Sequence, residues 1–203
     1  ERLGTMVLTE NGSTVCKEET SKAMLNGEYT LLSSYLSNNK LIAEKSFRYK
    51  GDFSKAEYSL KHYETGRLEQ ITFKGSQYQI CYRKKEKSSL ESKTISVPKP
   101  VLYDEGLVLY IREHWQALLK GESKEVSIVV PQRLDYYRFS IEGIWNEKSQ
   151  NLEVTIKPVN VFLRQLVKPI ELSLNTKKEL LKVKGLSPIA ALDGELQEVL
   201  INY

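Results

Sequence analysis

Hydrophobic and polar residues alternate along most of this chain, and the alternation predicts β-strands. In Glu28–Ser37, the side chains of Tyr29, Leu31 and Tyr35 fall on one face of an extended segment, because successive residues of a strand point to opposite sides of a sheet. The residues Asn-Asn-Lys follow as a turn signal, and Lys40–Lys50 then continues the alternation. These two segments predict a β-hairpin.

The same pattern returns before and after the middle of the chain, with glycine-rich or asparagine-rich turns between the segments. The further predicted strands are Lys55–Tyr63, Arg67–Phe73, Gln77–Arg83, Leu90–Val97, Lys124–Val130, Asp135–Trp145, Asn151–Lys157, Pro169–Asn175, Glu179–Gly185 and Glu195–Tyr203. The stretch between Pro158 and Pro169 is compatible with a strand or a short helix, and we favour the helix.

One segment has a helical period instead. In Asp104–Lys120, the apolar residues Leu107, Ile111, Trp115 and Leu118 are spaced by four, four and three positions, which places them on one face of a helix. A lone helix with such a broad apolar face has to lie against an apolar surface. The concave face of the predicted sheet is the surface that this chain offers.

The ends of this helix also carry capping signals. Asp104 is of a residue type that commonly caps helix N-termini. Gly121 stands where a left-handed residue commonly ends a helix.

These elements predict a mainly β protein that forms one domain over residues 1–203. We expect N-terminal hairpins in residues 1–97, the helix at 104–120, and C-terminal strands in 124–203 that complete the same sheet. The expected architecture is a single curved antiparallel sheet, a half-barrel of about eleven strands, with the helix packed on its concave face.

The charge pattern narrows the partners of the chain. The net charge is +4, but lysine and arginine alternate with aspartate and glutamate along the sequence, whereas nucleic-acid-binding domains usually concentrate positive charge on one face. We therefore expect no nucleic-acid partner. The densest basic run, Arg83–Lys87, is typical of a solvated hairpin end and leaves peripheral contact with an anionic membrane surface open. No apolar run is long enough to span a membrane.

Few residues suggest catalysis or metal binding. The two histidines, His62 and His114, and the two cysteines, Cys16 and Cys81, are scattered without the paired spacings of a zinc site. No serine-nucleophile or phosphate-binding glycine motif is present. The sequence therefore predicts no catalytic residue, no metal and no cofactor. A disulfide between Cys16 and Cys81 remains open if the protein is exported.

The order of segments resembles a group of uncharacterised exported proteins of Gram-negative bacteria that are related in architecture to the LolA/LolB lipoprotein carriers. The resemblance covers Gly27–Tyr203, and the helix that ends in LLKGE and the closing KGLSPI and INY carry most of it. The intervening runs that match are VSIVVPQRLDYYRFSIEG and VTIKPVNVFLRQLVKPIELSLN. These are scaffold patterns and not catalytic signatures.

The resemblance implies a half-barrel whose concave face holds a hydrophobic ligand. It implies a periplasmic protein whose precursor carries a signal peptide that this chain does not contain. The expected function is non-enzymatic binding of a lipid, an acyl chain or a lipoprotein segment. An envelope interaction module with a filled core and an envelope protein as partner is the alternative. An enzyme acting on a hydrophobic small molecule is the third reading, since an enzyme of violacein biosynthesis has this kind of fold and fold does not settle function.

The helix has two interpretations under these hypotheses. It is either a lid that controls access to an apolar cavity or a permanent filling of that cavity. In both cases the ligand-facing or core-facing residues are Leu107, Ile111, Trp115 and Leu118. The sequence leaves the ligand, the partner and the oligomeric state undetermined.

Overall fold

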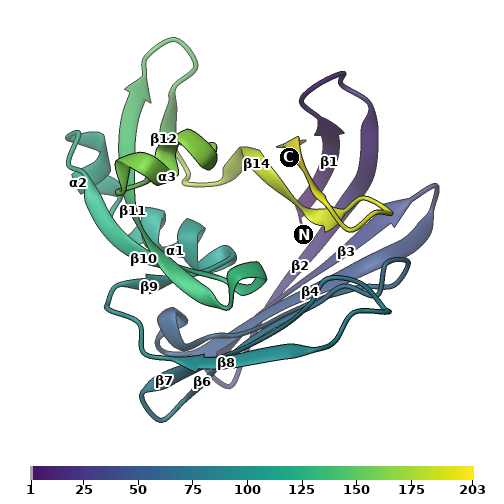
Figure 1. Cartoon of the computed structure of the whole chain (residues 1–203). Helices are drawn as coiled ribbons and strands as arrows, with labels where there is room; N and C mark the ends of the chain where they lie inside the picture. Colours follow the sequence, from purple (N-terminus) through teal and green to yellow (C-terminus); the bar gives the residue numbers. More distant parts are fainter. Residues whose placement is uncertain (1) are drawn as a thin grey trace.

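The computed structural model describes residues 2–203 and shows one open, strongly curved sheet of fifteen strands with three α-helices (Figure 1). The strands are β1 (Arg2–Leu8), β2 (Thr14–Leu25), β3 (Glu28–Ser37), β4 (Lys40–Lys50), β5 (Glu57–His62), β6 (Leu68–Lys74), β7 (Gln77–Arg83), β8 (Glu91–Ile95), β9 (Val101–Leu102), β10 (Lys124–Val130), β11 (Asp135–Asn146), β12 (Asn151–Pro158), β13 (Ile170–Asn175), β14 (Leu180–Ala190) and β15 (Leu196–Asn202). The helices are α1 (Glu105–Glu113), α2 (Trp115–Leu119) and α3 (Val161–Leu166), and short 3-10 turns lie at Phe53–Lys55 and Pro131–Arg133.

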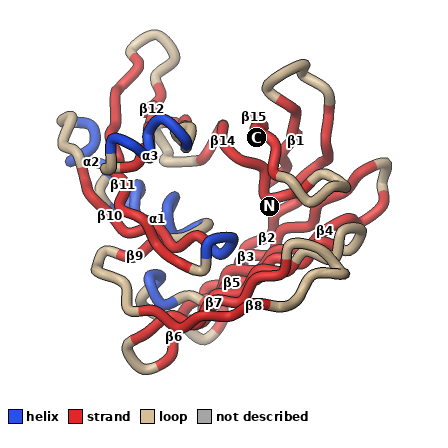
Figure 2. The backbone as a smooth tube through the Cα atoms, viewed as in Figure 1, coloured by secondary structure: helices blue, strands red, loops and turns tan. Residues whose placement is uncertain are grey.

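The sheet consists of two meanders that meet where the two ends of the chain pair. The strand order is β8-β7-β6-β5-β4-β3-β2-β1-β15-β14-β13-β12-β11-β10-β9. Neighbouring strands are antiparallel, except that β9 runs parallel to β10. The pairing of β1 with β15 joins the meanders, so the N- and C-terminal ends lie side by side (Figure 2).

The predicted fold class is confirmed at the level of a mainly β protein with one open curved sheet, but the strand number of about eleven is wrong. Strands β1, β2 and β9 were not predicted. The outer half of β2 is exposed on both faces, so its residues lack the alternation on which the prediction depended. The two-residue strand β9 is too short to give a period. The short helix expected after Pro158 is present as α3.

The central helix begins and ends close to the predicted positions but is interrupted at His114. The His114 backbone leaves helical geometry, with φ −96° and ψ 18°, and its ring Nδ1 lies 3.0 Å from the Tyr110 carbonyl oxygen, which its own amide also contacts. After α2, Gly121 has φ +76°, and its amide donates to the Leu118 carbonyl. The Gly121 end therefore confirms the predicted C-terminus.

Helix α1 lies inside the curve of the sheet, and its residues pack against two hydrophobic cores (Figure 1). The N-terminal core is built mainly on β1–β8, around residues such as Phe47 and Ile71. The C-terminal core joins α1 and α2 to β10–β14, around residues such as Ile111 and Ile141. Val101 and Leu102 of β9 are buried in different cores because alternate strand residues point to opposite sides.

Across residues 2–203, no helix combines the length and the apolar character that crossing a membrane would require.

Candidate functional site

The four apolar residues predicted on one helix face, Leu107, Ile111, Trp115 and Leu118, form an apolar stripe on the concave side of the sheet. Ile111 and Leu118 are fully buried and Trp115 is 6% exposed, all three within the C-terminal core. Leu107 is only partly buried against the same core. The structure therefore brings the four predicted residues together, three of them inside the protein.

The contact between α2 and the sheet is close. A Cβ atom placed on Gly143 of β11 would lie 3.0 Å from the Cβ of Leu118 and 3.1 Å from a methyl carbon of Leu152. Any side chain at Gly143 would push the helix away from the strand. In this structure the helices occupy the apolar concave face, so a ligand could reach that face only after they move.

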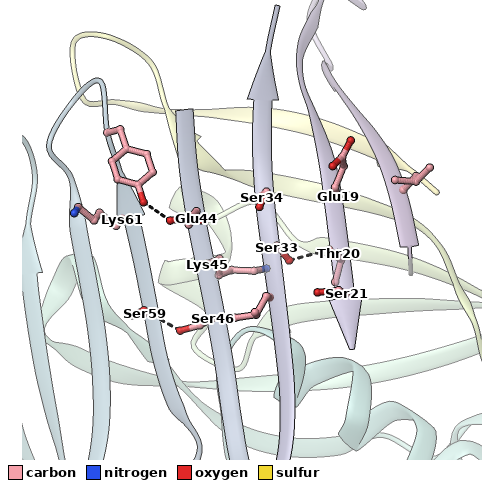
Figure 3. Close-up of a pocket in the computed structure, with 13 residues that line it drawn as sticks. Glu19, Thr20, Ser21, Ser33, Ser34, Glu44, Lys45, Ser46, Ser59 and Lys61 are labelled. Carbon is pink, nitrogen blue, oxygen red and sulfur yellow. Dashed lines mark hydrogen bonds between the residues drawn. The ribbon is translucent and has the colours of Figure 1, made fainter. Parts of the chain in front are cut away.

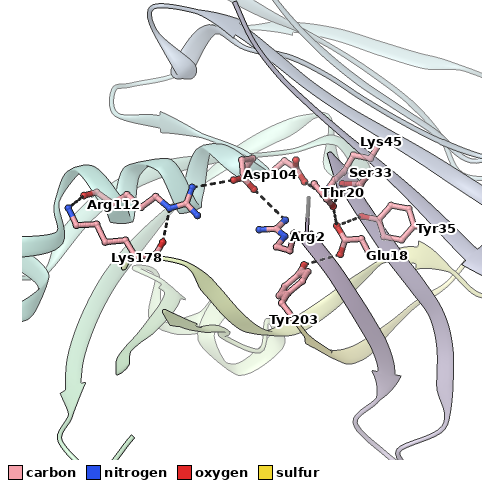
Figure 4. A network of polar contacts seen from close by, with 11 residues as sticks. Arg2, Glu18, Thr20, Ser33, Tyr35, Lys45, Asp104, Arg112, Lys178 and Tyr203 are labelled. Carbon is pink, nitrogen blue, oxygen red and sulfur yellow. Dashed lines mark hydrogen bonds and ion pairs between the residues drawn. The ribbon is translucent and has the colours of Figure 1, made fainter. Parts of the chain in front are cut away.

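The start of α1 is surrounded by a buried polar network that sequence analysis did not predict (Figure 4). Its members come from both ends of the chain and from the middle. They are Arg2 of β1, Glu18 and Thr20 of β2, Ser33 and Tyr35 of β3, Lys45 of β4, Asp104, Glu105 and Arg112 at α1, Lys178 after β13, and Tyr203 after β15. The network lies on the inner face of β1–β4, opposite the first turn of the helix.

Glu18 is the best-satisfied acid of this network. It is 1% exposed, and its carboxylate accepts hydrogen bonds from the Tyr203 hydroxyl at 2.9 Å and the Thr20 hydroxyl at 3.1 Å. Burial acts to raise the pKa of Glu18, but the positive charges of Lys45 and Arg2 outweigh it and hold that pKa below its usual value. Glu18 is therefore a buried carboxylate, and its negative charge has to be balanced by the neighbouring cations.

Lys45 connects this acid to the helix. Its ammonium lies 2.8 Å from the Asp104 carboxylate, and both side chains are largely buried. Although burial alone would lower the pKa of Lys45, Asp104 and Glu18 raise it above the usual value. Asp104 occupies the predicted N-cap position, but its side chain forms no capping hydrogen bond. The predicted capping role of Asp104 is therefore wrong, because the carboxylate pairs with Lys45 instead.

The backbone at Asp104 is also unusual. Its φ of 45° and ψ of −126° belong to a region that glycine favours and that side chains with a Cβ rarely adopt. Such conformations cost about 1–3 kcal/mol and persist where the surroundings enforce them. The Asp104 carboxylate is held by the ion pair with Lys45, and the strained residue is the junction between β9 and α1.

Glu105 is the third acid and the least compensated. Its side chain is 4% exposed, and both of its ion pairs, with Arg2 and with Arg112, are long at 3.7 Å. Its Oε1 atom has no hydrogen-bond partner. Burial raises the pKa of Glu105, Arg2 opposes the rise, and the charge of Asp104 adds to it.

The raised pKa of Glu105 predicts how the stability of the protein changes with pH. Glu105 has a higher pKa in the folded protein than in the unfolded chain, where a glutamate pKa is near 4.5. As pH rises above that value, the contribution of Glu105 to the stability of the folded state therefore decreases. We expect the free energy of unfolding of Glu105→Gln to increase relative to that of the parent as pH rises above about 4.5. Urea denaturation at several pH values measures the difference. The exposed Glu113→Gln on the same helix is the control, and an equal gain there would contradict the assignment to Glu105.

Arg112 links the other end of α1 to the turn after β13. Its Nε atom donates to the Lys178 carbonyl oxygen at 2.9 Å, and the Lys178 ammonium donates to the Arg112 carbonyl oxygen at 3.3 Å. The helical period placed Arg112 on the polar side of the helix, and the structure shows that this side is itself tied to the protein.

The N- and C-terminal ends of the chain meet directly in the network. The Arg2 guanidinium lies 4.3 Å from the centre of the Tyr203 ring, where a cation interacts favourably with aromatic electrons. A Cβ on Gly4 would come within 2.7 Å of the same ring. Glycine at this position therefore lets the Tyr203 ring approach β1 closely.

The structure contradicts a disulfide between the two cysteines, because both are free thiols. Cys16 is buried on the inner face of β2, with its Sγ 3.9 Å from the Met6 sulfur. Cys81 alternates with the buried Ile80 and so faces the outer side of β7. Four strands separate β2 from β7, which places the thiols much farther apart than the roughly 7 Å limit between the Cα atoms of a disulfide.

The two histidines have structural contacts. His62 is 2% exposed, its Nδ1 atom accepts the Thr65 amide at 3.2 Å, and burial lowers its pKa. His114 stacks on the Tyr110 ring, with ring centres 3.9 Å apart. Within residues 2–203, no group of three or more histidine, cysteine or acidic side chains is placed to hold a metal ion.

A shallow groove of about 670 Å³ lies on the outer face of β1–β5, opposite the face that carries α1 (Figure 3). Most of its outward-facing residues are polar. They include Glu19, Ser21, Ser34, Glu44, Ser46, Ser59, Lys61 and Tyr63. The Ser46 and Ser59 hydroxyls bond each other at 2.9 Å, and the Tyr63 hydroxyl donates to Glu44. Four of these eight groups are therefore paired with one another, and the shallow groove gathers no cluster of like charges.

Comparisons with known protein families, with curated proteins and with solved structures found no match for this chain.

Proposed function

We propose that this chain is a non-enzymatic binding protein of the Gram-negative cell envelope. It acts in the periplasm and holds a lipid, an acyl chain or a lipoprotein segment on the concave face of its sheet. Helices α1 and α2 are the lid over that face. The observation that carries the proposal is the position of the stripe, with Ile111, Trp115 and Leu118 buried on the concave side of an open sheet.

The polar network supports the lid role. A helix that only filled a core would need no charged groups at its first turn, and buried ion pairs are weak contributors to stability. The strained Asp104 stands between β9 and the helix, where a hinge would lie. In this proposal, the ion pair between Asp104 and Lys45 stabilises the closed position of the helix. When the pair separates, the Asp104 backbone returns to an unstrained conformation.

A second candidate is an interaction module of the envelope with a permanently filled core. The close contact between Gly143 and Leu118 favours it, because the helix and sheet fit each other without a gap there. In that case the protein acts through its outer surface and takes up no hydrophobic ligand.

The two candidates differ in the uptake of a fluorescent fatty acid. A ligand opens the lid only if it binds the open state better than the closed state. Replacing Leu107 and Ile111 with alanine weakens helix docking, at about 2–5 kcal/mol for a fully buried site. We therefore expect the double variant to bind the probe more tightly while its thermal stability falls. Titration of probe fluorescence and thermal denaturation measure the two effects.

A destabilised variant away from the helix is the control. Leu60 and Ile71 are buried in the N-terminal core, and their double alanine variant is expected to lose stability without gaining probe affinity. Saturable binding to the parent, displaced by phospholipid, supports the carrier. If the parent takes up no probe, and lipid extraction of protein from its own periplasm is empty, the carrier proposal is overturned in favour of the interaction module.

A further inference from the structure

The short helix α3, between β12 and β13, presents large apolar side chains to solvent. Val161 is 65% exposed, Phe162 is 79% exposed and Leu166 is 82% exposed. Single exposed apolar residues are common on protein surfaces, but several together mark a contact site. None of the buried residues of the structure belongs to this helix.

The segment has a defined shape in spite of its exposure. The Asn160 side chain caps the helix by accepting the amides of Phe162 at 2.9 Å and Leu163 at 3.3 Å. The Arg164 guanidinium donates to the Pro158 carbonyl oxygen at 2.6 Å and so ties the helix to the end of β12. The apolar side chains therefore project from a helix that is fixed to the protein by these hydrogen bonds.

The charged residues in the segment that contains α3 are all positive. Residues 159–169 contain Arg164 and Lys168 and no acidic residue. Lys168 is 77% exposed and forms an ion pair with Glu198 on β15, and Leu186, which pairs with Glu198 in the sheet, is 62% exposed. The apolar helix thus has cationic groups at its border and a further exposed leucine nearby.

We propose that α3 is a docking surface for a lipid bilayer that contains anionic headgroups. Phe162 and Leu166 enter the boundary between headgroups and acyl chains, and Arg164 and Lys168 lie among the phosphates. Short apolar projections flanked by lysine and arginine suit this interface, because the apolar area gives partitioning and the cations add attraction to anionic lipid. The inference goes beyond ligand binding on the concave face, because docking through α3 requires no movement of α1 or α2.

Cosedimentation with vesicles tests the surface. We expect the parent to bind mixed phosphatidylglycerol–phosphatidylcholine vesicles more strongly than phosphatidylcholine vesicles. The double variant Phe162→Ser and Leu166→Ser is expected to reduce binding to both by at least about tenfold, from the lost apolar burial. Lys168→Gln, which leaves the Arg164 hydrogen bond to Pro158 in place, is expected to weaken the preference for anionic vesicles and its dependence on salt.

Leu192→Ser is the matched control. Leu192 is 82% exposed like Leu166, but it lies in the turn between β14 and β15 beside Asp193 and Glu195. Vesicle binding should be unchanged in this variant, and melting temperatures should confirm that all variants fold. The proposal is overturned if the parent does not sediment with mixed vesicles or if Leu192→Ser loses binding equally. It is also overturned if the parent self-associates, and the double variant Phe162→Ser and Leu166→Ser loses that self-association but still binds vesicles. Fatty-acid uptake is measured without vesicles, so failure of the lid and failure of α3 docking are separate results.

Discussion

Replacing Trp115 with alanine is expected to lower the free energy of unfolding by about 3–5 kcal/mol. The ring is 6% exposed in the C-terminal core, beside Ile111 and Leu118. The Lys178 ammonium also lies 5.8 Å from the ring centre, so truncation removes both packing and a cation–π contact. Urea denaturation followed by circular dichroism measures the change.

Gln116→Ala is the matched control for this prediction. Gln116 is exposed and follows Trp115 directly in α2, so its truncation should stay within about 0.5 kcal/mol of the parent. Arg112 also lies on the polar side of the helix, but its hydrogen bond to Lys178 makes it unsuitable as a control. Equal losses for Trp115→Ala and Gln116→Ala would mean that the helix buries a different face.

Replacing Lys45 with methionine is expected to be comparably damaging, at about 3–5 kcal/mol. The substitution removes the cation that lies 2.8 Å from Asp104 and that holds the pKa of Glu18 low. Two carboxylates then remain in a buried environment with less positive charge to balance them. We expect the loss to be larger at neutral pH than at acidic pH, because the negative charge of Glu18 then lacks the cation that lowers its pKa. Denaturation midpoints at several pH values measure it.

Arg48→Met on the same strand is the control. Arg48 pairs with Glu57, but both side chains are at least half exposed, and pairs of this kind contribute about 0–1 kcal/mol. Adding Asp104→Asn to Lys45→Met should recover part of the stability, because it removes the carboxylate that lost its partner while keeping the size of the side chain. A Lys45→Met variant as stable as Arg48→Met would show that the network is well solvated in solution.

Much of the strand pattern was predictable from local sequence. Segments such as Glu28–Ser37 and Gln77–Arg83 alternate clearly, and the structure places them as strands with the predicted bounds. The helix was predictable because its apolar residues repeat with a helical period. β2 was missed because exposure on both faces of its outer half removes the alternation. In β1 the exposed Leu3 and the buried Met6 lie on opposite faces, so the apolar residues do not mark one face.

The candidate site was predictable only in its apolar part. Leu107, Ile111, Trp115 and Leu118 share a helix face by spacing alone, and three of them are buried. The polar network was not predictable, since no local signal distinguishes Lys45 or Glu18 from the many charged residues on strands. One faint signal was the position of Glu18, which shares a strand face with the buried Cys16 and Thr20.

The sequence by itself determined the elements of this protein, because strand alternation and helical period depend on residues a few positions apart. Tertiary structure alone decided that Arg2 and Tyr203, from opposite ends of the chain, lie in contact, since this follows from the pairing of β1 with β15. It also decided that Lys45 meets Asp104 and that the thiols are separate. Burying an unpaired ion is energetically unfavourable. The pairing of distant strands therefore decides which charged residues are buried and which partners they have.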